Sequence, residues 1–338
     1  MMNKHWMLVS GLCLGLAACL GGGVGVSDSP SPNPDSGQPA ADPGYGGGNT
    51  TVRFALKSGN QAVNCNSLLS GIGVSQAQAK LTEGMIYVHD VVLINSRGQE
   101  VPLQLDQGSP WQFLNLALLD FAGGSCKQPG VDNNKPLAGS NSEVVGSVPA
   151  GAYTGLSFKV GVPVSAKNAK GEDVALNHQP AHKPPHPILG VYWLMWEWQS
   201  GHRFMRVDLA PEGGVKRQDG SSNDKWAFHL GSTDCQADSA VVGGYRCGKP
   251  NRVKVRFDQF NPRQDRVVLD LQSLFAGSDV ARDDSADFGC KSNVTDQECQ
   301  TLFRQLDLRL DESSPGGNDG GQPLTDGRHS KVFRLEKI

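Results

Sequence analysis

A two-residue alternation of apolar and polar side chains recurs from residue 51 to the end of the sequence. Its clearest apolar members are Val52, Phe54 and Leu56; Val101, Leu103 and Leu105; Met205, Val207 and Leu209; Trp226, Phe228 and Leu230; Val253, Val255 and Phe257. Because successive side chains of a strand point to opposite faces, this spacing is typical of half-buried strands. The range 85–94 is a nearly continuous apolar run interrupted by His89 and Asp90, which predicts a central strand covered on both faces. We therefore expect a mainly β fold, an antiparallel β-sandwich.

The composition fits such a fold and excludes one class of function. Gly and Pro number 42 and 20 among the 338 residues, and this abundance favours turns over long helices. Hydrophobic residues make up 38% of the chain, enough to bury a substantial core. The 31 Lys and Arg nearly balance the 34 Asp and Glu, for a net charge of -3. Because nucleic-acid binders concentrate positive charge, we expect no nucleic-acid partner.

Two short helices are predicted within a single domain. Thr295 and Glu298 have the spacing of a capping box, and apolar residues then follow at helical spacing as far as Leu306. A shorter helix is expected from Gln112 to Asp120. The range 311–328 is polar and is expected to be irregular.

The N-terminus is predicted to direct the chain out of the cytoplasm. An apolar run ends in Leu-Ala-Ala-Cys at Cys19, which is typical of a bacterial lipoprotein signal in which residues 1–18 are removed and Cys19 is acylated. The alternative is an ordinary cleaved signal with an incidental Cys. The range 19–50 is rich in Gly, Pro and Ser and predicts a flexible tether to a single domain at 51–338. We expect the acyl chains to hold this domain on the periplasmic side of the envelope, by default at the outer membrane.

Six cysteines remain in the predicted domain, and an oxidising compartment favours three disulfides. Fifteen pairings are open, but local spacing favours two short-range bridges and leaves one long-range bridge: Cys235 with Cys247, Cys290 with Cys299, and Cys65 with Cys126. The alternative is a thiolate metal site, although no C-x-x-C motif occurs. If the thiols are oxidised, a transition-metal site must use His, carboxylate or Met ligands.

Histidines gather in the most unusual part of the sequence, interleaved with Trp193, Trp196 and Trp198. They are His178, His182, His186 and His202. The first three have H-x3-H-x3-H spacing, but the prolines among them forbid a helix, so they share a metal only if the loop folds back. Otherwise His182 and His186 belong to a solvated His/Pro loop. In the strand predicted at 226–230, alternation places His229 on the face opposite the core, free to reach a ligand. For His89, inside an apolar strand, a hydrogen-bonded core histidine is the simpler interpretation.

Several short motifs occur in an order that resembles one known family. They are Tyr87-Val88-His89-Asp90-Val91, Trp111-Gln112, Gly161-Val162-Pro163, Leu176-Asn177-His178, Trp196-Glu197-Trp198-Gln199-Ser200-Gly201 and His229-Leu230-Gly231-Ser232-Thr233. From about Val52 to Leu308 the chain is similar to the MbnP family, the four-Cys member of the metallo-mystery pair. The resemblance assigns the four family cysteines to Cys235, Cys247, Cys290 and Cys299.

The resemblance implies a periplasmic copper-binding protein that is not an enzyme and functions in copper homeostasis or beside methanobactin. Its implied partner is a dihaem enzyme, similar to MauG and the bacterial cytochrome c peroxidases, that oxidises a Trp to kynurenine. Carried over by motif, His178 and His229 are the expected copper ligands, and Trp196 and Trp198 are the candidates for oxidation. His89 and His202 depart from the usual family pattern and are further candidate ligands. Unmodified indole offers only an N–H donor, so an intact Trp could shield copper but not bind it through that nitrogen.

Two other functions compete with this one. The Trp cluster could instead form the recognition surface of a β-sandwich module that binds a protein or small ligand, with the histidines incidental. A hydrolase is the weakest hypothesis, because the sequence shows no activated nucleophile or carboxylate pair.

Overall fold

The computed structural model describes residues 45–65, 67–122, 126, 137, 139–179, 184–196, 201–285, 287–310, 321–328 and 330–338. The predicted signal peptide, Cys19, most of the tether, His182 and Trp198 lie outside these residues. Within the described ranges, no helix is both long enough and apolar enough to cross a membrane.

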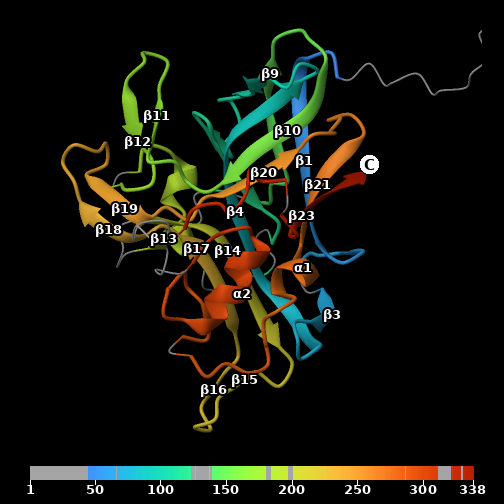
Figure 1. Cartoon of the computed structure of the whole chain (residues 1–338), viewed down its shortest axis with the longest axis vertical. Helices are drawn as coiled ribbons and strands as arrows, with labels where there is room; N and C mark the ends of the chain where they lie inside the picture. The colour runs from blue at the N-terminus through green and yellow to red at the C-terminus, as the bar shows by residue number, and fades with distance from the viewer. Residues whose placement is uncertain are drawn as a thin grey trace, which may run out of the picture. The chain divides into compact units, whose positions relative to one another are not determined.

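Strands dominate the described residues (Figure 1). The first half contains β1 (Gly48–Ser58), β2 (Gln61–Ala62), β3 (Leu68–Ile72), β4 (Ala77–Asn95), β5 (Glu100–Pro102), β6 (Gln104–Leu105), β7 (Gln112–Phe113), β8 (Leu116–Asp120), β9 (Glu143–Val148), β10 (Tyr153–Val160), β11 (Ser165–Lys167) and β12 (Asp173–Ala175). The second half contains the 3-10 turns η2 (Pro187–Gly190) and η3 (Tyr192–Leu194), then β13 (Met195–Trp196), β14 (Gly201–Pro211), β15 (Val215–Lys216), β16 (Ser222–Asn223), β17 (Trp226–Gly231), β18 (Thr233–Ala237), β19 (Tyr245–Lys249), β20 (Val253–Phe257), β21 (Asp265–Asp270), α1 (Leu271–Phe275), β22 (Gly289–Cys290), α2 (Gln297–Gln305) and β23 (Phe333–Lys337).

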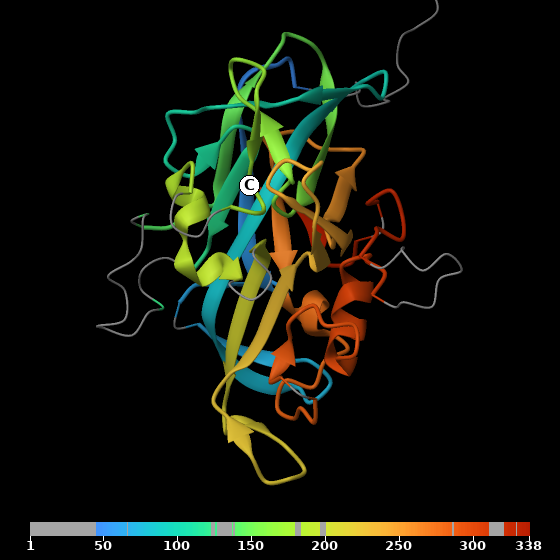
Figure 2. The same ribbon diagram turned by 90° about the vertical axis from the view of Figure 1, so that its left-hand side faces the viewer.

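The longest strand, β4, forms the centre of the larger sheet. Along one edge it pairs first with β14 and then with β10, and along the other with β3, β8 and β5 in turn. The chain of hydrogen-bonded neighbours in this sheet is β20-β10-β4-β14-β17-β22, in which β10 and β14 bond to successive parts of β4. Figure 2 shows β4 in cyan running beside β14 and β17 in yellow. All residues from Gly84 to His89 are buried, which confirms the predicted strand covered on both faces.

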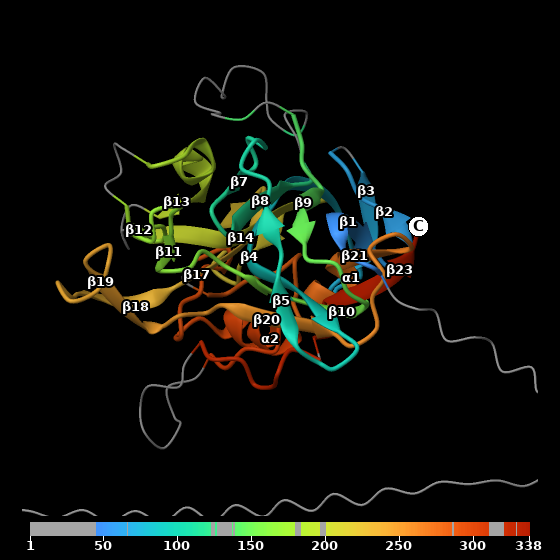
Figure 3. The ribbon, with the colours of Figure 1, turned by 90° about the horizontal axis from the view of Figure 1, so that it is seen from above.

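The second sheet has the order β23-β21-β1-β9-β6, and its first three strands lie together in Figure 3. Aromatic side chains join the two sheets. Phe158 of β10 makes edge contacts with Phe54 of β1 at 5.4 Å and with Phe333 of β23 at 5.7 Å between ring centroids. Ordered contacts begin before residue 51, because Tyr45 is buried and bridges to Tyr153. The predicted mainly β sandwich is confirmed.

The structure corrects three details of the predicted fold. The expected helix from Gln112 to Asp120 is wrong: this range forms β7 and β8, and β8 pairs with β4 while every one of its residues is buried. A short apolar run does not by itself distinguish a buried strand from a helix. The range 101–105 is two strands, because the chain passes at Leu103 from pairing with β4 to pairing with β9. Among the described strands, pairing is antiparallel except between β1 and β21 and between β17 and β22, and the isolated bridge from Lys216 to Arg282 is also parallel.

The predicted C-terminal helix is present as α2, with one difference at its start. The N-cap is Asp296 rather than Thr295, and its side chain accepts a hydrogen bond from the backbone N–H of Glu298 at 3.1 Å. Cys299, Leu302 and Phe303 form its buried face, as the helical spacing predicts.

All three favoured disulfides are present, joining Cys65 to Cys126, Cys235 to Cys247, and Cys290 to Cys299. The second links the paired strands β18 and β19, and the third links β22 to α2. Since β22 pairs with β17, this last bridge attaches the helix to the neighbour of the strand that contains His229.

Replacement of Phe158 by Ala is expected to destabilise the domain by about 3–5 kcal/mol, because it removes a fully buried ring between the two sheets. Val74→Ala, at a side chain that is 60% exposed, is the control and should change the free energy of unfolding by less than about 0.5 kcal/mol. Denaturant unfolding with the disulfides intact measures both. Equal midpoints for the two variants would contradict a core that joins the sheets at Phe158.

Candidate metal centre

Trp196 is buried against a glycine of the neighbouring strand β17. It is 1% exposed and pairs with Gly201 across the β13–β14 hairpin. Its six-membered ring lies against Gly231 of β17, where a Cβ would meet Trp196 Cζ3 and Cε3 at 2.4 and 2.7 Å. Because residues 229 and 231 share one face of the strand, the Trp196 ring lies over the face that presents His229.

His178 reaches the same hairpin from the loop after β12. Its Nε2 is 3.2 Å from the position that a Cβ would occupy at Gly201, directly across from Trp196. The imidazole is 4% exposed and stacks on Tyr245 of β19 with 5.0 Å between centroids. Its Nδ1 lies 3.4 Å from Asn177 Nδ2. The structure therefore brings His178, Trp196 and His229 to the adjoining strands β13, β14 and β17.

His229 belongs to a buried network of charged groups. Its Nε2 is 2.9 Å from Asp208 Oδ1, while its Nδ1 is buried without a hydrogen-bond partner among the described residues. Asp208 Oδ2 accepts hydrogen bonds from Arg206 Nε and Nη2 at 2.9 and 2.6 Å. Burial would raise the pKa of the Asp208 carboxyl, but the hydrogen bond to His229 and the Arg206 guanidinium outweigh it and lower that pKa to about 2. At neutral pH Asp208 is therefore an ionised acceptor.

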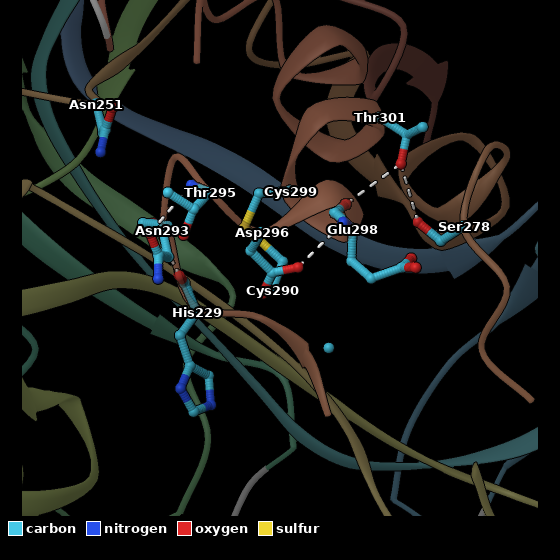
Figure 4. Close-up of a disulfide and its surroundings, with 12 residues drawn as sticks. His229, Asn251, Ser278, Cys290, Asn293, Thr295, Asp296, Glu298, Cys299 and Thr301 are labelled. Carbon is cyan, nitrogen blue, oxygen red and sulfur yellow. Dashed lines mark hydrogen bonds between the residues drawn. A yellow bond between two sulfur atoms is a disulfide. The ribbon is translucent and has the colours of Figure 1, made fainter. Parts of the chain in front are cut away.

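The strand that bears His229 is also held from its other side. The Ser292 hydroxyl donates to the His229 carbonyl at 2.9 Å and accepts from the Gly231 N–H at 3.1 Å. Ser292 follows Cys290 closely, so the Cys290–Cys299 disulfide anchors the segment that makes these bonds. Figure 4 shows the His229 imidazole directed away from this disulfide. The bridge thus fixes the backbone of His229 and leaves its ring free to face Asp208.

The other two candidate ligands have different surroundings. The His202 ring lies between two backbone carbonyl groups. Its Nδ1 is 2.7 Å from the Asn177 carbonyl oxygen and its Nε2 is 3.0 Å from the Leu189 carbonyl oxygen. His89 is buried in β4, with Nδ1 3.2 Å from the Asp90 carboxylate and no hydrogen-bond partner for Nε2 among the described residues. Metal binding by either remains a prediction, and at His202 it would require release of a carbonyl contact.

The three-histidine loop site gains no support from the described residues. The His186 ring accepts from the Ile188 N–H as the cap of η2 and stacks on Phe113 at 4.8 Å. His178 stacks on Tyr245 instead. His186 therefore has a structural role of its own, while His182 lies outside the described residues.

One group of potential ligand atoms is compact, but it is not a thiolate site. His178 lies with Cys235 and Cys247, and one ligand atom from each falls within 4.8 Å of the others. The two sulfurs are joined as a disulfide, so neither is a thiolate. A site that includes His178 must draw its other ligands from elsewhere.

Burial favours the neutral form of both proposed imidazole ligands. Burial lowers the pKa of His178 to about 4, assisted by the nearby His202 and the positive charge of Arg252. Burial also lowers the pKa of His229, against the opposing hydrogen bond and charge of Asp208. Neutral imidazole is the form that binds metals, so these side chains need lose no proton to act as ligands.

Sequence reasoning missed Arg206 and Asp208, although a signal for them existed. They alternate with Met205, Val207 and Leu209 and therefore lie on the opposite face of β14. The register pairs Arg206 with His229 and places Asp208 one step along that face. The polar face of the predicted strand could have been paired with His229 only if the neighbouring strand had been known.

The two-sheet architecture, the three disulfides and the His–Trp cluster define a class: a disulfide-bonded, mainly β protein with a buried candidate metal centre. The chain belongs to the MbnP family, whose model matches residues 47–294. Among solved structures it is similar to MbnP from Methylosinus trichosporium, with 35% identity and a TM-score of 0.77 over 87% of this chain and 100% of that chain. No curated protein matches the sequence. The resemblance drawn from the motifs is confirmed.

The low pKa of His178 predicts that stability falls in mild acid. His178 takes up a proton near pH 6.5 in the unfolded chain but only near pH 4 in the folded protein. Its contribution to the free energy of unfolding is therefore complete above pH 6.5 and is lost as the pH falls towards 4. Between pH 6.5 and about 5, His178 alone should account for a loss of about 1–2 kcal/mol. Urea unfolding of the metal-free protein against His178→Gln measures it: the variant should show the shallower pH dependence. Identical slopes would show that His178 titrates normally.

Proposed function

We propose that this chain is a copper-binding lipoprotein of the periplasm, without catalytic activity, in which His178 and His229 supply imidazole ligands. The observation that supports it most directly is the His229 Nδ1, a buried ring nitrogen that has no partner among the described residues. A buried polar atom without a hydrogen bond is costly unless something else satisfies it. A bound metal ion would do so.

The donor set suits copper among the available metals. Imidazole binds both oxidation states of copper, and copper has the highest affinity in the divalent series. With all six described cysteines in disulfides, no thiolate from them competes for the ion. His178 and His229 would hold copper at the β13–β14 hairpin, close to Trp196.

Trp196 is the oxidation site that we propose, because its ring lies over the face of β17 that presents His229. Conversion to kynurenine cleaves the indole bond between Cγ and Cδ1 and places one oxygen on each carbon, which consumes two equivalents of peroxide and releases two of water. Hydrolysis of the resulting N-formyl group then releases Cδ1 as formate. The former Nε1 becomes an aniline nitrogen with a lone pair, whereas intact indole offers only a donor. Oxidation of Trp196 would therefore add a third ligand to the two imidazoles.

The proposed oxidant is a dihaem partner enzyme similar to MauG and the bacterial cytochrome c peroxidases. Acylation of Cys19 would anchor the protein to the envelope, so that copper binding and oxidation by the partner enzyme would both occur there. Family membership supports a role in copper homeostasis or beside methanobactin. The competing recognition-module hypothesis is less well supported, because Trp196 is 1% exposed and does not offer a binding surface.

Replacement of either proposed ligand is expected to remove near-stoichiometric copper. His178→Ala and His229→Ala should each lower the copper content and weaken affinity by at least about 10-fold, because imidazole ligands are lost from the site. His186→Ala is the matched control, since that imidazole caps η2 and stacks on Phe113. Metal analysis and competition with a chromophoric Cu(I) chelator measure the effect. Unchanged copper binding in the double variant would overturn the proposal.

Peptide mass mapping of residues 190–203 from protein isolated from its own periplasm tests the modification. We expect Trp196 to have gained one oxygen and lost one carbon, as in kynurenine, and to remain unmodified when the dihaem partner is deleted. The same peptide contains Trp193 and Trp198, which serve as internal controls. Modification of Trp198 alone would move the site by two residues. Intact tryptophans together with metal-free protein after copper supply would favour the binding-module function.

A further inference from the structure

Asp208 makes a direct and buried contact with a proposed copper ligand. The carboxylate is 2% exposed, and its Oδ1 lies 2.9 Å from His229 Nε2. An ionised carboxylate only accepts hydrogen bonds, so Nε2 must donate its proton to it. Neutral imidazole has a single N–H, and the lone pair of His229 is therefore on Nδ1.

Arg206 holds the carboxylate in this orientation. Its Nε and Nη2 both donate to Oδ2 of Asp208, which leaves Oδ1 for the imidazole. The strand register sets the arrangement: Arg206 pairs with His229 across β14 and β17, and Asp208 is two residues farther along the same face. Both oxygens of the carboxylate are thus in use, and rotation of its side chain would break hydrogen bonds to both partners.

The same network extends to the segment that contains the tryptophans. Arg206 Nη1 donates to the Trp193 carbonyl at 3.3 Å, and Arg203 Nη1 donates to the Trp193 and Met195 carbonyls at 2.7 and 2.8 Å. The guanidinium groups of Arg206 and Arg203 also lie over the Trp193 and Trp196 rings, at 5.6 and 5.9 Å from the centroids. Arg206 and Arg203 of β14 therefore link the Asp208–His229 pair to the backbone next to Trp196.

From this geometry we infer that Asp208 is a positioning residue that fixes His229 as the Nε2–H tautomer and so presents Nδ1 as the copper-binding atom. The inference rests on the proposed function, because it assumes that His229 is a ligand. A carboxylate that accepts from the second nitrogen of a ligand imidazole both orients the ring and makes it a stronger donor. Arg206 supports this role through the carboxylate.

The tautomer can be read directly from the copper-free mature protein. Long-range 15N–1H correlation spectra, assigned by comparison with His229→Ala, should show His229 with its proton on Nε2. In Asp208→Asn the two tautomers should become mixed, because an amide can present either an oxygen or an N–H to the ring. A proton on Nδ1 in the unmodified protein would overturn the inference, even if the variant failed to fold.

Copper affinity separates this inference from the proposed function. Asp208→Asn should weaken Cu(I) binding by about 10–100-fold, the range typical of lost partners behind a ligand. The matched control is Asp265→Asn, which alters a buried aspartate of β21 that pairs with Lys337 in the other sheet, and it should leave the affinity unchanged. If His229→Ala loses copper but Asp208→Asn binds like the control, the positioning role is wrong while the copper function stands. If His229→Ala binds copper normally, the proposed ligand itself fails.

Discussion

The pairing of β14 with β4 on one edge and with β17 on the other is the constraint on which the candidate metal centre depends. Strand β4 is buried on both faces from Gly84 to His89, so a one-residue slip of its register would exchange the side chains of two faces that pack against different neighbours. That fixed strand sets the register of β14, and β14 in turn places Arg206 opposite His229. The packing of the core therefore determines where Arg206, Asp208 and His229 lie, and only His178 comes from a loop.

Burial gives the site its chemical character. Removing His178 and His229 from water favours their neutral forms, and the protonated form that would exclude a metal is suppressed. A buried carboxylate is costly to leave alone, but the two donors of Arg206 and the N–H of His229 satisfy Asp208. The Trp196 ring packs against Gly231 because glycine has no side chain to fill that space.

Local patterns predicted much of the fold because they report on one element at a time. Alternation identified β1, β14, β17 and β20, and the spacing of the cysteines indicated the three bridges. The same reasoning failed at residues 112–120, where β8 is buried among other strands and its apolar run lacks a diagnostic period. It also read the range 101–105 as one strand, because the passage of the chain between two sheets at Leu103 leaves the alternation intact.

For the candidate centre, the sequence alone identified the proposed residues through their motifs: His178 in Leu-Asn-His, His229 in His-Leu-Gly-Ser, and Trp196 in the W-x-W segment. It also determined the oxidation of the cysteines through their number and predicted compartment. Only the tertiary structure decided which of these residues meet, and that Asp208 and Arg206 lie behind His229. The reason is physical: pairing among β13, β14 and β17 places residues 196, 208 and 229, and strand pairing depends on the partner's register rather than on any local period. His178 joins them from the loop after β12, whose path no local period predicts.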